Sequence, residues 1–243
     1  MNAALAAAAT LVATGFALST FDRWLRKHRP HDLAWAISLA LFGVGSGALW
    51  WAESSGWTLG AFRVFYLAGA VLNVPWLALG TVYLLAGTSI GHRVRWWLTW
   101  LSGLATGVVL FAPTRTEIFG SELPTGKDVF GVAPRVLAAV GSGVAALVIV
   151  AGALWSAVRA IRHRPPAFGR HPRTAIAPGR LAVGNVLIAI GTVVLSASGT
   201  LAGRVGKDRA FAITLLVGIV VLFIGFLVAA TPSRSAGGPQ VAD

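Results

Sequence analysis

Long runs without a charged residue constrain this chain more than any other feature. The run FAITLLVGIVVLFIGFLVAA at 211–230 is one example. Its length matches the hydrocarbon core of a bilayer, which a helix of about 17–25 residues crosses. Only 12% of the residues are charged and 56% are hydrophobic, whereas soluble domains carry about 25% charged residues. We therefore predict an all-α integral membrane protein.

The apolar runs predict seven transmembrane helices in one membrane domain, residues 1–230. Short polar or basic segments separate them, and the polar tail 231–243 is expected to be disordered. The spans are expected near 3–21, 33–53, 60–86, 95–113, 134–158, 181–203 and 210–230.

The Lys and Arg residues gather on one side of this seven-span plan. Thirteen of the 20 lie in the segments after spans one, three and five or in the tail. The positive-inside rule places that side in the cytoplasm, with the N-terminus outside and the C-terminus inside. Because arginine, alanine and glycine are abundant, we expect a multi-pass protein of a bacterial inner membrane. The net charge of +12 predicts contact with the bilayer's anionic headgroups, and no nucleic acid.

Spans one and five resemble each other at a constant offset of 136 residues. Spans two and three resemble spans six and seven more weakly, so residues 3–86 are expected to repeat as 134–230, with 95–113 as a linker helix. This 3+1+3 order is a parallel repeat, and binding sites in such proteins lie between the copies. The identical pairs are Leu11/Leu147, Val12/Val148, Ala17/Ala153, Leu18/Leu154, Arg23/Arg159 and Arg26/Arg162.

This plan resembles that of the SWEET sugar transporters and the layout of the microbial rhodopsins. The resemblance is one of architecture. The last span has no lysine to which retinal can attach, and spans one and two lack the prolines expected of a SWEET-type carrier. We therefore assign the chain to neither family.

Catalytic and cofactor motifs are missing from the sequence. There is no cysteine, the five histidines fall in expected loops, and no span centre holds Asp or Glu. Intramembrane pumps and hydrolases generally need such groups. We therefore expect no catalytic residue, no cofactor, no metal site and no enzymatic activity.

Polar and aromatic residues at 63–87 predict a binding site in span three. They are spaced as in a heptad, so they are expected to share one face of the helix. Pro75 removes a backbone donor and is expected to free a carbonyl near Val71. The seam consists of Arg63, Tyr66, Asn73, Trp76 and Tyr83. The predicted ligand-binding residues are Tyr66, Asn73, Pro75 and Trp76, with Asn185 of span six. The alternative is that Asn73 only fixes helix packing.

Charged and small residues at the span ends suggest further contacts. Glu53 is expected to form an outer gate or ion pair with Arg63 or Arg209. The Gly43/Gly47 pair predicts close helix packing. Two tryptophan groups are expected to anchor the interfaces, namely Trp50, Trp51 and Trp57 outside and Trp96, Trp97 and Trp100 inside.

Three functions remain open from the sequence. The first is a carrier or channel for a small neutral or weakly polar solute, bound between the repeats. The second is a non-transporting sensor, receptor or accessory subunit, with a membrane partner protein or a second copy. The third is a lipid-interacting membrane protein.

Overall fold

The computed structural model describes residues 2–118, 123–162, 178–201 and 207–230, and this part of the chain is helical without β-strands. The predicted tail 231–243 lies outside it. The long helices are α1 (Asn2–Lys27), α2 (Pro30–Ser55), α5 (Thr88–Phe111), α7 (Val132–Arg162), α8 (Pro178–Leu201) and α9 (Lys207–Ala230). Span three is divided into α3 (Leu59–Phe65), a π-helix η1 (Tyr66–Leu72) and α4 (Asn73–Ala86), and α6 is the short helix Gly126–Val129.

Six helical stretches of the described residues are long and apolar enough to cross a membrane, as in a multi-pass helical membrane protein. In α8 the described apolar stretch, Val186–Leu195, is shorter. A seventh span and the orientation of the chain therefore stay predictions. The six stretches are Ala3–Lys27, Pro30–Ser55, Leu59–Ala86, Thr88–Phe111, Val132–Ser156 and Phe211–Val228.

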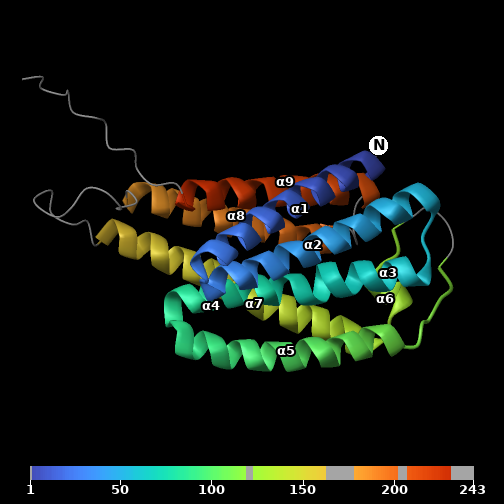
Figure 1. The fold of residues 1–243 in the computed structure, drawn as a ribbon. Coiled ribbons are helices and arrows are strands. Elements are labelled where there is room, and N and C mark those ends of the chain that lie inside the picture. Colours follow the sequence, from blue (N-terminus) through green and yellow to red (C-terminus); the bar gives the residue numbers. More distant parts are fainter. Residues whose placement is uncertain (1, 119–122, 163–177, 202–206, 231–243) are drawn as a thin grey trace, which may run out of the picture.

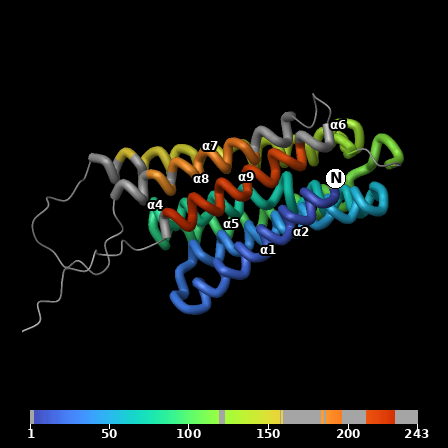
Figure 2. Tube along the Cα trace, turned by 90° about the horizontal axis from the view of Figure 1, so that it is seen from above, coloured from blue at the N-terminus to red at the C-terminus, as the bar shows by residue number. Residues whose placement is uncertain are grey.

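Six of the long segments pack side by side in a closed ring. The order of neighbours is α1, α2, α4, α7, α8 and α9, and α9 packs back against α1. Figures 1 and 2 show the helices running roughly along one common direction. Helix α5 packs on α4, η1 and α7 only along part of its surface, and it lies at the edge of the bundle (Figure 1). It is therefore a peripheral helix beside the ring.

Local sequence signals set the turns between these helices. Pro30 is the first residue of α2, where its missing N–H costs no helical hydrogen bond. Gly56 ends α2 with φ of 92°, and the Thr58 side chain caps α3 by accepting from the backbone N–H of Ala61. Gly87 has φ of 84° and separates α4 from α5. A residue without a Cβ adopts these positive φ values without strain.

The closest crossing of α2 on span three lies at Gly45. A Cβ there would stand 3.1 Å from the backbone nitrogen of Gly69 in η1, whereas one on Gly47 would only approach Thr10 at 3.7 Å. Close packing was predicted for the Gly43/Gly47 pair, which faces α1: a Cβ on Gly43 would lie 3.4 Å from the Thr14 hydroxyl oxygen. The tightest backbone contact of this helix is instead two residues away from either glycine, because Gly45 faces the π-helix.

An aromatic cluster fills the end of the bundle that carries the α2–α3 turn. Trp57, Phe62, Tyr66 and Phe130 have neighbouring rings in this cluster. Trp57 is only 3% exposed. Its prediction as an interfacial anchor is wrong, because the chain folds it under the ring of Phe62, whereas most of the other predicted anchors are widely exposed.

Candidate functional site

The candidate site is centred on Asn73, the first residue of α4. Its side chain is buried between helices with an exposed fraction of 8%, and Ser38 of α2 is exposed by 1%. The Ser38 hydroxyl lies 2.7 Å from Oδ1 of Asn73 and 2.9 Å from its backbone oxygen. A serine hydroxyl has one proton. It therefore donates to one of these acceptors at a time or is shared between them.

A small cavity adjoins this pair inside the ring. Its volume is about 20 Å³, which is room for about one water molecule. Ser38, Asn73 and Thr192 supply its polar lining, and none of the described residues that line it is charged. The apolar lining consists of Leu39, Phe42, Val74, Leu77, Leu195, Ile219 and Leu222. The walls thus come from α2 and α4 on one side and from α8 and α9 on the other.

The π-helix precedes Asn73 and is braced by a second hydroxyl. The Asn73 N–H donates to the carbonyl of Ala68, five residues earlier. At this spacing the partner of the Ala70 carbonyl would be Pro75, which has no N–H. The Ser142 hydroxyl of α7 donates to the Ala70 oxygen instead. A free carbonyl was predicted from the sequence near Val71, four residues before Pro75. In a π-helix the hydrogen bond spans five residues, so the carbonyl that Pro75 leaves free is that of Ala70, one residue earlier.

The predicted seam of span three does not face one partner. Tyr66 packs against Phe130 in the aromatic cluster, and Trp76 donates its indole N–H to Ser102 of α5 at 3.2 Å. Neither lines the cavity that Asn73 lines. The seam prediction assumed a regular helix. The wider π turn changes the direction of every residue that follows it.

The other predicted site residues lie farther from this cavity or beyond the described side chains. Arg63 donates from a terminal guanidinium nitrogen to the Ala112 carbonyl at 2.8 Å, which ties α3 to the end of α5. Glu53 lies in the last turn of α2. Asn185 and Arg209 belong to α8 and α9, but their side chains lie outside the described part. The predicted outer gate thus stays a prediction.

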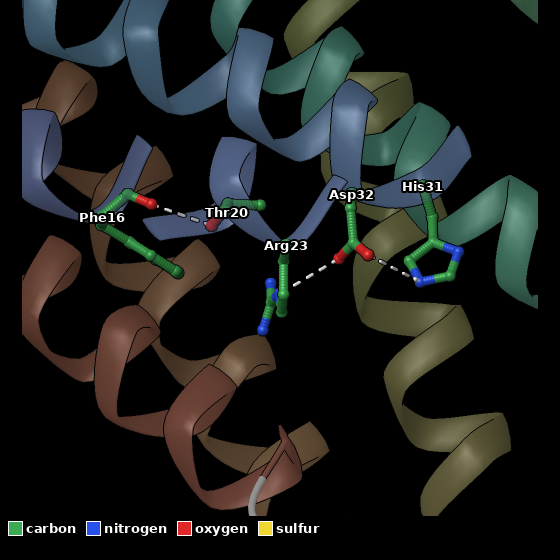
Figure 3. A network of polar contacts seen from close by, with 5 residues as sticks. All are labelled: Phe16, Thr20, Arg23, His31 and Asp32. Atoms are coloured by element: carbon green, nitrogen blue, oxygen red, sulfur yellow. Dashed lines mark hydrogen bonds and ion pairs between the residues drawn. The ribbon is translucent and has the colours of Figure 1, made fainter. Parts of the chain in front are cut away.

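A second polar cluster, missed by the sequence analysis, joins α1 to α2 (Figure 3). Asp32 has a side chain exposed by 4%, and its carboxylate lies 3.3 Å from Nε of Arg23 and 3.9 Å from Nε2 of His31. Nε of Arg23 has no aligned hydrogen-bond partner, so the charges attract without a directed bond. The sequence does contain a signal for this cluster. Asp32 lies in the first turn of a helix that starts at Pro30, where the helix dipole stabilises a negative charge.

Metal binding finds no support among the described residues. They contain no group of three or more His, Cys, Asp or Glu side chains that could hold a metal ion. His92, for example, pairs with the hydroxyl of Tyr83 at 3.1 Å.

Comparison of the chain with protein-family models, with curated proteins and with solved structures gives no significant match.

Proposed function

We propose that this membrane protein is a carrier for a small uncharged polar solute, bound at the cavity beside Asn73. The observation that best supports this proposal is a small cavity inside the ring at which polar side chains meet. It lies between residues 38–77 of α2 and α4 and residues 192–222 of α8 and α9. The Ser38 hydroxyl already bonds Asn73, and the Thr192 hydroxyl donates to the Ile188 carbonyl. A polar solute would therefore bond to the remaining lone pairs of these two oxygens and to the amide of Asn73.

The packing order of the helices supports a site between two halves. The first half is α1, α2 and the α3–α4 segment, and the second is α7, α8 and α9. Helix α4 packs on α7, and α9 packs on α1. The last segment of each half thus contacts the first helix of the other half. Two parallel three-helix copies related by an axis along the membrane normal are expected to make such a pair of equivalent contacts. Helix α5 then serves as the linker.

The lining favours a neutral solute. Among the described lining residues, an ion in this cavity would meet hydroxyl and amide groups but no opposite charge. Burial of an unpaired charge is costly in a protein interior and in a membrane. A solute with hydroxyl, amide or carbonyl groups is matched by the three polar side chains.

The cavity volume implies that transport requires the two halves to move apart. A space of about 20 Å³ holds about one water molecule and no larger solute. Span three can bend where η1 meets Pro75, because the regular helical ladder is already interrupted there. We therefore assign the described conformation to the closed state of the carrier.

Uptake into proteoliposomes tests the proposal, with labelled glycerol, urea and glucose as probes. We expect uptake of at least one probe above that of protein-free vesicles. Thr192→Val should reduce it, because this change removes a cavity hydroxyl at nearly constant volume. Ser102→Ala is the matched control, since its hydroxyl faces Trp76 and not the cavity. Uptake of none of the probes, or equal loss in both variants, contradicts the proposal.

A non-transporting sensor, receptor or accessory subunit is the second candidate. The small size of the cavity favours it, because such a protein needs no solute path. This reading predicts a partner protein that stays bound in mild detergent and is crosslinked in native membranes. A monodisperse protein without a partner that also takes up one probe would exclude it.

The proposed orientation places the α1–α2 and α4–α5 turns in the cytoplasm of a bacterium. Since the chain has no cysteine, single cysteines can report sidedness. We expect a membrane-impermeant maleimide to label Ser55→Cys in intact cells and Ser89→Cys only after permeabilisation. The reverse pattern would show that the positive-inside assignment is wrong.

A further inference from the structure

The outward face of α5 carries an unusual row of side chains. Arg93, Trp96, Trp97 and Trp100 recur at spacings of three and four residues, so they lie on one side of the helix. The three indoles are 63–68% exposed. The opposite side of α5 holds Ala105 and Val109, which are buried against the bundle. We refer to residues 93, 96, 97 and 100 as the α5 outer face.

We propose that the α5 outer face binds the headgroup of an anionic phospholipid. Tryptophans on lipid-facing helices prefer the interface, where the indole N–H meets phosphate and ester oxygens. Trp76 satisfies its indole with Ser102 inside the protein, whereas the outer-face indoles point away from the bundle. A bound lipid would supply their acceptors.

The distances along the helix suit a single lipid. Arg93 precedes Trp100 by seven residues, which is about 10 Å of helix. The guanidinium can therefore sit at the phosphate level while the indoles occupy the ester and upper acyl region. Leu104 continues the same face with a 60% exposed apolar side chain, as an acyl chain requires.

Charge at this end of the bundle favours an anionic lipid. The acids near the α1–α2 turn are already engaged, since Asp22 pairs with Arg26 at 2.9 Å and Asp32 with Arg23. The described ion pairs do not include Arg93. A cation close to an anionic membrane surface gains about 1 kcal/mol.

The same charge argues against a second copy on this face. Two α5 helices packed in parallel would bring two Arg93 guanidinium groups together with no carboxylate on either outer face. Like charges in contact oppose association. An anionic lipid is therefore the better occupant.

Native mass spectrometry of the full-length protein tests this proposal. The protein is equilibrated in mixed micelles of phosphatidylglycerol and phosphatidylcholine, and the ratio of retained lipids is measured. We expect the wild-type protein to retain phosphatidylglycerol preferentially. In Arg93→Gln the ratio of retained phosphatidylglycerol to phosphatidylcholine should fall about fivefold, which corresponds to the loss of about 1 kcal/mol for one cation at an anionic surface. Lys127→Gln, which removes an exposed cation at the opposite end, should retain the wild-type ratio.

Further arms of the experiment separate the lipid from other occupants. Trp96→Phe combined with Trp100→Phe keeps an aromatic ring at each position but removes two N–H donors, and it should also lower retention. High salt should weaken the wild-type preference, a result that needs no variant to fold. An unchanged ratio in Arg93→Gln, or a salt-independent one, overturns the proposal. So does efficient disulfide crosslinking of Trp100→Cys in native membranes, because a second copy would then cover the face.

Discussion

The hydrogen bond between Ser38 and Asn73 gives the sharpest prediction about the packing of this protein. Ser38→Ala removes a hydroxyl that lies 2.7 Å from Oδ1 of Asn73. Interhelical hydrogen bonds in membranes contribute about 0.6 kcal/mol on average and about 1.7 at most. A buried acceptor left without a partner costs about 1–3 kcal/mol. The adjoining cavity moderates this, because a water molecule there can donate to the bared oxygen. We expect a loss of about 1 kcal/mol.

Ser142→Ala provides the comparison that isolates the effect of the cavity. Its hydroxyl serves the Ala70 carbonyl, and neither residue lines the cavity. A water molecule in that cavity therefore does not reach the bared carbonyl, and we expect a loss of about 1–3 kcal/mol, larger than that of Ser38→Ala.

Equilibrium unfolding by SDS in mixed micelles, followed by circular dichroism, measures both losses. The double-mutant cycle of Ser38→Ala with Asn73→Ala should give a coupling free energy of about 0.6–1.7 kcal/mol. A coupling near zero would refute the bond as a stabilising contact. A loss for Ser38→Ala that exceeds the loss for Ser142→Ala would refute the role of the cavity water.

Three further perturbations test contacts elsewhere in the bundle. Gly45→Ala should cost about 1–3 kcal/mol because its methyl group meets backbone atoms, whereas Gly47→Ala should be neutral or slightly stabilising; the same SDS titration compares them. Asp32→Asn should lower the free energy of unfolding by about 1–3 kcal/mol, less than the loss for a fully buried pair. Asp22→Asn, in an exposed pair, should lower it by about 0.5 kcal/mol or less. Equal losses in thermal melts would contradict this ranking. Arg63→Gln should loosen the end of α5, which faster hydrogen exchange at residues 112–118 would report, and unchanged exchange would argue against it.

The membrane helices could be predicted from the sequence because lipid leaves few alternatives. A charge-free run of about 20 residues must satisfy its own backbone, and a helix does so within the run. Six described helices coincide with predicted spans for this reason. Their ends differ by a few residues; α1 continues to Lys27, beyond the predicted 21, because the helix extends into its basic flank.

The centre of the candidate site was predictable only in part. Asn73 was identified because an amide in an apolar span needs a partner. Its partner Ser38 was not paired with it, since that contact depends on the register between α2 and α4. The π-helix was missed as well. The Ser142 hydroxyl of α7 bonds the Ala70 carbonyl, and Gly45 of α2 lets η1 approach closely at Gly69; neither contact can be read from residues 66–72 alone.

A packing role and a binding role for Asn73 do not exclude each other in this fold. Its bond to Ser38 joins α2 to α4, which belong to the same half of the ring. Across the cavity stand Thr192 and the apolar side chains of residues 195, 219 and 222. In lipid, apolar helix contacts are held by dispersion without an added hydrophobic term. Separating the halves at this level would therefore break weak contacts while the Ser38 bond keeps Asn73 in place. In the carrier that we propose, a residue fixed within one half, at the wall that faces the other, would meet a solute when the cavity opens.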